Sequence, residues 1–225
     1  DKVVYHAKLG SQGARVQRVQ AIARSVGQML GGNALAVQAE RAARLAKADL
    51  VTDMVGEFPE LQGVMGGYYA RHDGESEAVA HAIEDHYKPR FSGDTLPRNT
   101  VGIAVALADK LETLGGLFSV GERPTGDKDP FALRRHALGV IRMLIERNLP
   151  LAMPQLGMAV ATAQLPDVFE IGEFTGFLYD RLVGYLRELD YSAQEVDAVV
   201  SLRRPRWADL PRRLAAVRAF AALPE

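Results

Sequence analysis

The stretch Gly126-Asp127-Lys128-Asp129-Pro130-Phe131-Ala132-Leu133-Arg134-Arg135 combines a glycine turn, a helix start and a pair of arginines. Asp129 suits an N-cap, because its carboxylate can accept the free amide hydrogens of the next turn. Pro130 suits the first helical position, where a missing N–H costs nothing. The apolar residues that follow approximate one helical stripe: Leu133, Leu138, Ile141, Leu144 and Ile145. We therefore expect a helix over residues 130–147.

Arg134, Arg135 and Arg142 lie mostly off this stripe, so cations project from the first turns of the expected helix. Cations near a helix N-terminus oppose the helix macrodipole, and an anionic partner would relieve that conflict. The alternative is a pair of solvated arginines beside Asp127 and Asp129. On local sequence alone the second interpretation is favoured.

Helical periodicity extends over most of the chain, and no strand-like alternation persists. The expected helices span residues 12–30, 34–55, 60–71, 75–88, 99–119, 130–147, 171–189, 192–200 and 207–221. Gly31-Gly32-Asn33 marks a break between the first two helices, and prolines at positions 150 and 154 mark a boundary. The sequence thus predicts an all-α protein with a compact helical bundle over residues 1–150 and a helical extension over residues 151–225.

The composition is that of an ordinary globular protein, with 48% hydrophobic and 24% charged residues. The chain has no cysteine, which excludes disulfides and thiolate metal sites. Its net charge of −1 gives no overall attraction to nucleic acid, although six arginines gather over residues 201–218, as a phosphate-facing surface or a solvated helix face. Neither a signal peptide nor a membrane-spanning run is evident, so we expect a cytoplasmic location and no membrane partner.

Several blocks resemble, in order and spacing, the β subunit of the bacterial heterotetrameric glycyl-tRNA synthetase. They comprise YHAKLGS at residues 5–11, KADLVTDMVGEFPELQGVMG at residues 47–66, ADKLETL at residues 108–114, and the loop and helix quoted above. Together they run from residue 5 to about residue 147. The resemblance implies an internal fragment, because the family's chain is far longer, and no anticodon-binding domain is evident after Glu225.

The N-terminal bundle also resembles an HD domain, the helical fold of many metal-dependent phosphohydrolases, in which His and Asp ligate a metal that activates water. The matching segments are Ala48-Asp49 for the His-Asp pair, Phe58-Pro59-Glu60 for a His-Pro-Glu turn, His86-Tyr87 for a His-His pair, and Asp109 for the final Asp. Alanine and phenylalanine supply no lone pairs, and an apolar ring disfavours a hydrated cation. We therefore interpret Asp49, His86 and Asp109 as vestigial positions without a functional metal. Asp49 and Asp109 are expected to cap or pair internally, with Lys47 or Lys110 as partners.

Two other sequence features can be explained by ordinary structural roles. His72-Asp73 is a literal His-Asp dipeptide, but it precedes Gly74 and polar residues, so we expect an exposed turn. Trp207 lies among arginines, where it suits either a base-stacking platform or an anchor for the last helix.

The resemblance to the synthetase implies a part in attaching glycine to tRNA. In the family, the α subunit carries the adenylate-forming active site, the β subunit recognises tRNA(Gly), and the whole enzyme uses ATP and Mg. The leading hypothesis is a non-catalytic tRNA-contacting and scaffold region, without a cofactor of its own, that works with the α subunit in a heterotetramer and with other domains of β. Charge and motif position select the candidate RNA-binding residues Arg134, Arg135, Lys128, Arg123, Lys110, Lys8, Arg15 and Arg18.

Two alternatives stay open. A metal-dependent HD-type phosphohydrolase would bind its metal at Asp49, His86 and Asp109, and the substitutions at Ala48 and Phe58 argue against it. A purely structural spacer would connect other parts of the β subunit and have no affinity for RNA.

Overall fold

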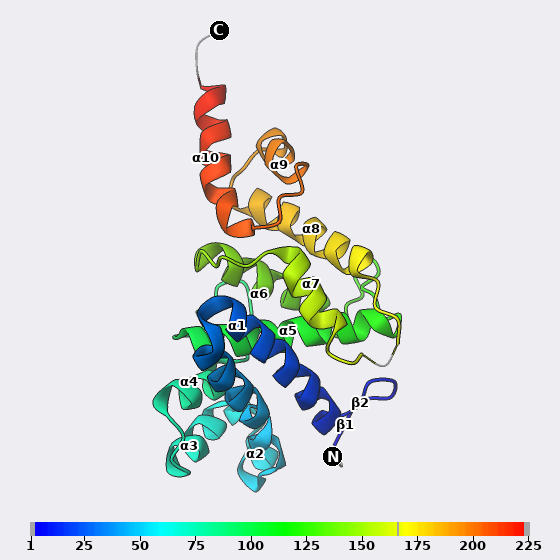
Figure 1. Cartoon of the computed structure of the whole chain (residues 1–225). Coiled ribbons are helices and arrows are strands. Elements are labelled where there is room, and N and C mark those ends of the chain that lie inside the picture. The colour runs from blue at the N-terminus through cyan, green and yellow to red at the C-terminus, as the bar shows by residue number, and fades with distance from the viewer. Residues whose placement is uncertain (1–2, 166, 223–225) are drawn as a thin grey trace.

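The computed structural model describes residues 3–165 and 167–222. Over these residues the chain is all-α, as predicted, apart from a short antiparallel hairpin of β1 (Val4–His6) and β2 (Gly10–Ser11) before the first helix (Figure 1). The α-helices are α1 (Gln12–Leu45), α2 (Asp53–Glu57), α3 (Val64–His72), α4 (Glu77–Asp85), α5 (Thr100–Ser119), α6 (Leu133–Glu146), α7 (Met153–Ala161), α8 (Ile171–Glu188), α9 (Ala193–Val200) and α10 (Leu210–Ala221). Three short 3₁₀ helices are η1 (Ala48–Val51), η2 (Pro59–Leu61) and η3 (Trp207–Asp209). Within the described ranges, no helix combines the length and the apolar character needed to cross a bilayer.

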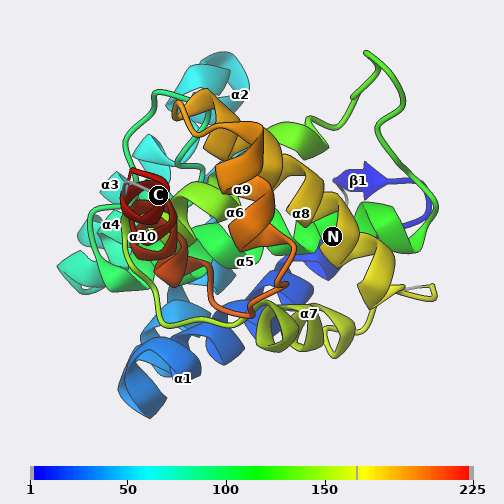
Figure 2. The same ribbon diagram turned by 90° about the horizontal axis from the view of Figure 1, so that it is seen from above.

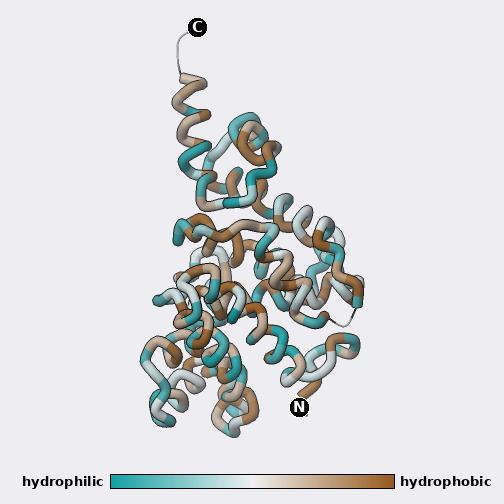
Figure 3. The backbone as a smooth tube through the Cα atoms, viewed as in Figure 1, coloured by the Kyte–Doolittle hydropathy of each residue, from teal (hydrophilic) through white to brown (hydrophobic). Residues whose placement is uncertain are grey.

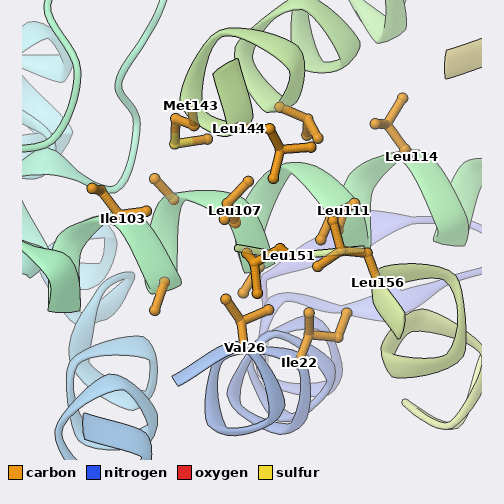
Figure 4. Close-up of a cluster of buried hydrophobic side chains, with 14 of the residues drawn as sticks. Ile22, Val26, Ile103, Leu107, Leu111, Leu114, Met143, Leu144, Leu151 and Leu156 are labelled. Carbon is orange, nitrogen blue, oxygen red and sulfur yellow. The ribbon is translucent and has the colours of Figure 1, made fainter. Parts of the chain in front are cut away.

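Helix α5 is the centre of the bundle, and every one of its residues from Val101 to Ser119 is buried. Helices α1, α4, α6 and α7 pack against it. Leu107 and Leu111 of α5 lie between Ile22 of α1 on one side and Leu144 of α6 on the other (Figure 4). Most of the surrounding helices alternate between hydrophobic and hydrophilic residues along their length, as expected of helices with one face in a core (Figure 3).

Helix α1 consists of two arms, because Gly31 and Gly32 interrupt it with non-helical backbone angles. Gly32 has a φ of 70°, in the left-handed region that glycine enters without strain. The two arms are joined by an ion pair between Arg24 and Glu40, whose atoms lie 2.5 Å apart. The predicted break at Gly31-Gly32 is confirmed.

The predicted continuation of the second arm to residue 55 is wrong. α1 ends at Leu45, and η1 and α2 follow as separate short turns. The hydroxyl of Thr52 donates to the carbonyl of Asp49 at 2.7 Å and accepts from the N–H of Val55 at 3.4 Å. Such local hydrogen bonds from a side chain pair backbone groups that a continuous helix would otherwise pair with each other.

Helix α6 begins at Leu133, three residues later than predicted, and Pro130 lies outside it. Ala132 has a φ of 53°, which ends any helical run from Pro130. The carboxylate of Asp129 nevertheless accepts the N–H groups of Leu133 at 2.8 Å and Arg134 at 2.9 Å. Asp129 therefore caps the helix from a position further upstream than a standard N-cap.

Helix α7 was not predicted, because the prolines around it favour a break. Pro154 occupies its first turn, where a proline is tolerated. Gln155 Oε1 accepts from the N–H of Ala152 at 3.2 Å. Met153, Leu156 and Val160 are buried at helical spacing, which is the signal that could have revealed this helix. The other predicted helices are present, with ends shifted by a few residues.

The C-terminal helices build outward from α6 and α7. Helix α8 packs on both, α9 packs on α8, and α10 extends away from the rest of the bundle (Figures 1 and 2). Trp207 is 1% exposed and makes an edge contact with Tyr179, so it is an anchor and not a stacking platform. The N–H of Met153 donates to the carbonyl of Pro205 at 2.8 Å, which ties the start of α7 to the segment before α10. The division of the chain near residue 150 stays a prediction.

Replacing Gly115 by alanine should separate α5 from α7. A Cβ at Gly115 would lie 2.2 Å from Cγ1 of Val160, far inside van der Waals contact. We expect the free energy of unfolding in urea to fall by about 1–3 kcal/mol, as for other overpacked cores. Gly176→Ala in α8 is the control, because a Cβ there meets no atom within 4 Å, and it should raise stability by about 0.5–1 kcal/mol. Unchanged stability of Gly115→Ala would contradict the close approach of the two helices.

Candidate functional site

The segments that resemble HD-domain motifs meet beside the middle of α5. Lys47 connects three of them, because its Nζ lies 3.1 Å from Oδ1 of Asp109 and 3.9 Å from the centre of the Tyr87 ring. The Tyr87 ring in turn packs on the ring of His86, with centroids 3.8 Å apart. The sequence motifs therefore mark one place in the fold.

Asp49 is buried, and its carboxylate forms hydrogen bonds with backbone N–H groups. Its Oδ2 accepts the N–H groups of Gly63 at 2.6 Å and Gly66 at 3.1 Å, which fixes the turn before α3 to η1. The predicted internal role of Asp49 as a cap is confirmed. His72-Asp73 lies exposed at the end of α3, as expected.

A network of buried charges joins α1 to α5. Arg15 contacts Asp109 at 3.0 Å and Glu112 at 2.8 Å, and Arg18 contacts the other oxygen of Glu112 at 2.8 Å. With Lys47, three cations face two carboxylates, and each of the five side chains is at most 9% exposed. The predicted pairing of Asp109 with Lys47 is confirmed.

These contacts decide the charge of Asp109. Burial alone would raise the pKa of its carboxyl group, but Arg15 and Lys47 hold that pKa well below its usual range. Asp109 is therefore an ionised carboxylate whose charge is already balanced by protein cations. A metal ion at this position would have to displace two strong partners.

His86 is fully buried and neutral, since burial holds the pKa of its imidazole well below the usual range. Its Nδ1 lies 2.5 Å from the carbonyl of Ile83, and its Nε2 has no partner among the described residues. Asp49, His86 and Asp109 are not arranged as a metal site: within residues 3–165 and 167–222, no three His, Asp or Glu side chains are grouped so that they could hold an ion.

The structure separates the candidate RNA-binding residues into two groups. Arg15 and Arg18 are each 7% exposed and bound to internal carboxylates, so their guanidinium groups serve the core. Arg123 donates to Glu173 at 2.6 Å and to the carbonyl of Phe118 at 2.7 Å, which ties the loop after α5 to α8. The guanidinium groups of these three arginines are therefore engaged in contacts within the chain.

The remaining candidates lie at or near the surface, except Lys110. Arg135 and Lys128 are exposed, and Lys8 is exposed while its Nζ donates to the carbonyl of Val120 at 3.3 Å. Arg134 is half-buried and donates to the carbonyl of Gly126 at 2.5 Å, which holds the glycine turn against α6. Lys110 is buried.

Two adjoining pockets share Arg135, and we call them together the basic groove. The first, of about 260 Å³, is lined by Glu60, Gln62, Tyr87, Pro89, Arg90, Lys110, Ala132, Arg135 and His136. The second, of about 300 Å³, is lined by Phe91, Ser92, Arg134, Arg135, Leu138, Arg181, Gly184, Tyr185 and Glu188. Arg90, Phe91 and Arg181 of this lining are not among the residues selected from the sequence. Arg90 and Phe91 directly follow the His86-Tyr87 motif, and that proximity is the signal that could have found them.

The chain matches known proteins over its whole length. The family model described as glycyl-tRNA synthetase beta subunit matches residues 1–201. The chain is 66% identical over 230 residues to the glycine–tRNA ligase beta subunit of Dechloromonas aromatica and 64% identical over 227 residues to that of Thiobacillus denitrificans. In both comparisons all of this chain is covered, and it spans 32% of the relative's length.

Removing one charge from the buried network should lower the free energy of unfolding much more than removing one charge from an exposed ion pair. Glu112→Gln leaves Arg15 and Arg18 without their shared carboxylate. We expect the free energy of unfolding in urea to fall by about 3 kcal/mol or more, because a buried charge then loses its partner. In the control Glu173→Gln, whose partner Arg123 lies near the surface, the loss should stay below about 1 kcal/mol. Equal losses would show that the network is not a buried one.

Stability should rise with pH above neutrality. Burial lowers the pKa of both Lys47 and Lys110 from 10.5 to about 8. Between pH 8 and 10.5 the unfolded chain therefore binds more protons than the folded chain, and the folded state gains with rising pH. From pH 8 to 9.5 we expect each lysine to add up to about 2 kcal/mol to the free energy of unfolding.

Urea denaturation at these two pH values measures the effect. Lys110→Met should lose its share of the increase, whereas Lys128→Met removes an exposed lysine and should keep the full increase. A free energy of unfolding that falls over this window would contradict the burial of the two ammonium groups.

Proposed function

The chain belongs to the glycyl-tRNA synthetase β-subunit family, and from that premise we propose that it is a non-catalytic, tRNA-contacting and scaffold part of glycine–tRNA ligase. The whole enzyme would attach glycine to tRNA(Gly) with ATP and Mg in the cytoplasm. The proposed partners are the α subunit, in a heterotetramer, and other parts of the β subunit. In this proposal the α subunit carries out the chemistry.

The basic groove is the observation that carries the RNA-contact part of the proposal. Its lining includes the cations of Arg90, Lys110, Arg134, Arg135 and Arg181 against the carboxylates of Glu60 and Glu188. Such a local excess of positive charge suits a phosphate backbone even though the whole chain is nearly neutral.

The groove also offers an apolar surface for an unpaired base. Phe91 lies at the edge of the groove and is 60% exposed. The guanidinium of Arg142 donates to the backbone carbonyls of Phe91 at 3.4 Å and Asp94 at 2.9 Å. These hydrogen bonds hold the backbone that carries the exposed ring against α6. Proteins bind single-stranded RNA with this combination, in which cations contact the phosphates and an accessible aromatic ring stacks on a base.

The scaffold part of the proposal is supported by the fate of the HD-like motifs. Asp49 caps a turn, and Asp109 is neutralised by Arg15 and Lys47. These side chains hold helices together, and none of them is left as a free acid, base or metal ligand. This arrangement favours a structural role over phosphohydrolase chemistry.

Charge reversal in the groove tests the proposal. We expect the chain to bind tRNA(Gly) at low salt, with an affinity that falls steeply at moderate salt as counterions are replenished. Arg135→Glu should weaken binding by at least about fivefold at low salt and reduce the salt slope. Binding is measured by fluorescence anisotropy of labelled tRNA(Gly), with a non-cognate tRNA alongside.

Arg44→Glu is the matched control, since Arg44 is also exposed but lies on α1 and does not line the groove. It should change the affinity by less than about twofold. The absence of binding at low salt would favour a purely structural spacer, and equal effects of the two reversals would remove the groove from the proposal.

A further inference from the structure

Lys110 is a buried cation without a carboxylate partner. It is 2% exposed, and the single hydrogen bond of its Nζ among the described residues goes to the carbonyl of Tyr87 at 3.1 Å. An ammonium group has three N–H donors, so two remain unused. The other buried lysine, Lys47, forms an ion pair with Asp109. The fold therefore balances one of these charges internally and leaves the other to be balanced from outside.

The side chain of Lys110 passes α6 at a glycine. A Cβ at Gly139 would lie 2.5 Å from Cε and 2.8 Å from Cδ of Lys110. A glycine inside a helix is unfavourable in itself, because alanine would lose less chain entropy there. Here it leaves the space through which the lysine stem runs toward the first pocket of the basic groove.

Two more cations stand at the rim of that pocket. Arg90 and Arg135 line it and are exposed, and among the described residues neither guanidinium group forms an ion pair. Glu60 is the carboxylate in the lining. His136 also lines it, and burial lowers the pKa of this imidazole to about 3, so that it adds a polar group without charge. Three cations thus face one carboxylate around a space of about 260 Å³.

We propose that this first pocket, which we call the Lys110 pocket, binds one phosphate group. The Lys110 ammonium would contact it from the floor as a point charge, and the guanidinium groups of Arg90 and Arg135 would contact it from the rim. Arginine forks match the oxygens of a phosphate in pairs, and contacts of this kind are stronger than bonds between neutral groups. The inference rests on the proposed function only for the source of the phosphate, which is then an RNA.

Titration of the chain with inorganic phosphate tests the pocket directly. We follow the backbone amide resonances of residues 88, 90–92 and 132–137, with residues 193–200 of α9 as an internal reference. The expected result is saturable shifts at the pocket and none on α9. Lys110→Met should weaken the affinity by at least about tenfold, whereas Arg44→Gln, with the same loss of one positive charge outside the pocket, should change it by less than about twofold.

Gly139→Ala provides a second test that keeps every charge. Its methyl group must push the stem of Lys110 aside, so phosphate binding should weaken while urea unfolding still reports a folded chain. Should Lys110→Met fail to fold, this variant and Arg90→Gln decide the matter. The inference would be overturned if the chain without substitutions showed no saturable phosphate binding. It would also be overturned if Gly139→Ala and Arg90→Gln both left the phosphate affinity unchanged.

Two dinucleotides then distinguish the sources of the phosphate. One carries a 5′-phosphate, and the other has a 5′-hydroxyl and only its internal phosphodiester. Competition by the first alone supports a terminal phosphate, competition by both supports an RNA backbone phosphate, and competition by neither overturns a nucleic-acid source. Phosphate binding without tRNA binding would refute the proposed function alone, and tRNA binding without phosphate binding would refute the Lys110 pocket alone.

Discussion

Between α1 and α5, Arg15, Arg18 and Lys47 enclose Asp109 and Glu112, and the position of the first helix against the central one depends on these contacts. Burying such charges is costly unless each is paired and hydrogen-bonded. The network meets that condition by sharing carboxylates: Glu112 uses one oxygen for each arginine. Because the charges must find their partners, only one rotation of α1 about its own axis is compatible with the core. Apolar contacts alone, with many alanines on α1, would define that rotation less well.

The same central helix separates two kinds of charge. Asp109 and Lys110 are neighbours in the chain and point to different sides of α5, because successive residues of a helix lie about 100° apart. Asp109 belongs to the closed network, whereas Lys110 extends past Gly139 toward the basic groove. Asp109 therefore stabilises the fold on one side, and Lys110 lines the groove on the other. A structural role and the proposed binding role are compatible on one helix because they occupy different faces.

Much of the architecture was predictable from residue patterns, and the errors have physical causes. Helical periodicity identified α5 and α8, and the glycines at 31 and 32 located the break in α1. Asp129 was correctly identified as the cap of α6, but its carboxylate acts from beyond a residue in the left-handed region, which no periodicity reveals. Among the candidate site residues, Arg15 and Arg18 were selected for charge alone. Their carboxylate partners lie about a hundred residues away in sequence, so their burial depends on tertiary contacts that local patterns do not contain.

The enclosure of α5 has a consequence for the motions of the chain. With every residue from Val101 to Ser119 covered, the amide hydrogens of this helix have no route to solvent through local fraying. Their exchange with deuterium should require the opening of the whole bundle, and they would therefore report the global unfolding equilibrium. Helix α10 buries only Leu210 and Leu214, so its last turns can exchange through small local openings. One chain thus contains both extremes of amide protection, with the slowest hydrogens immediately beside the groove.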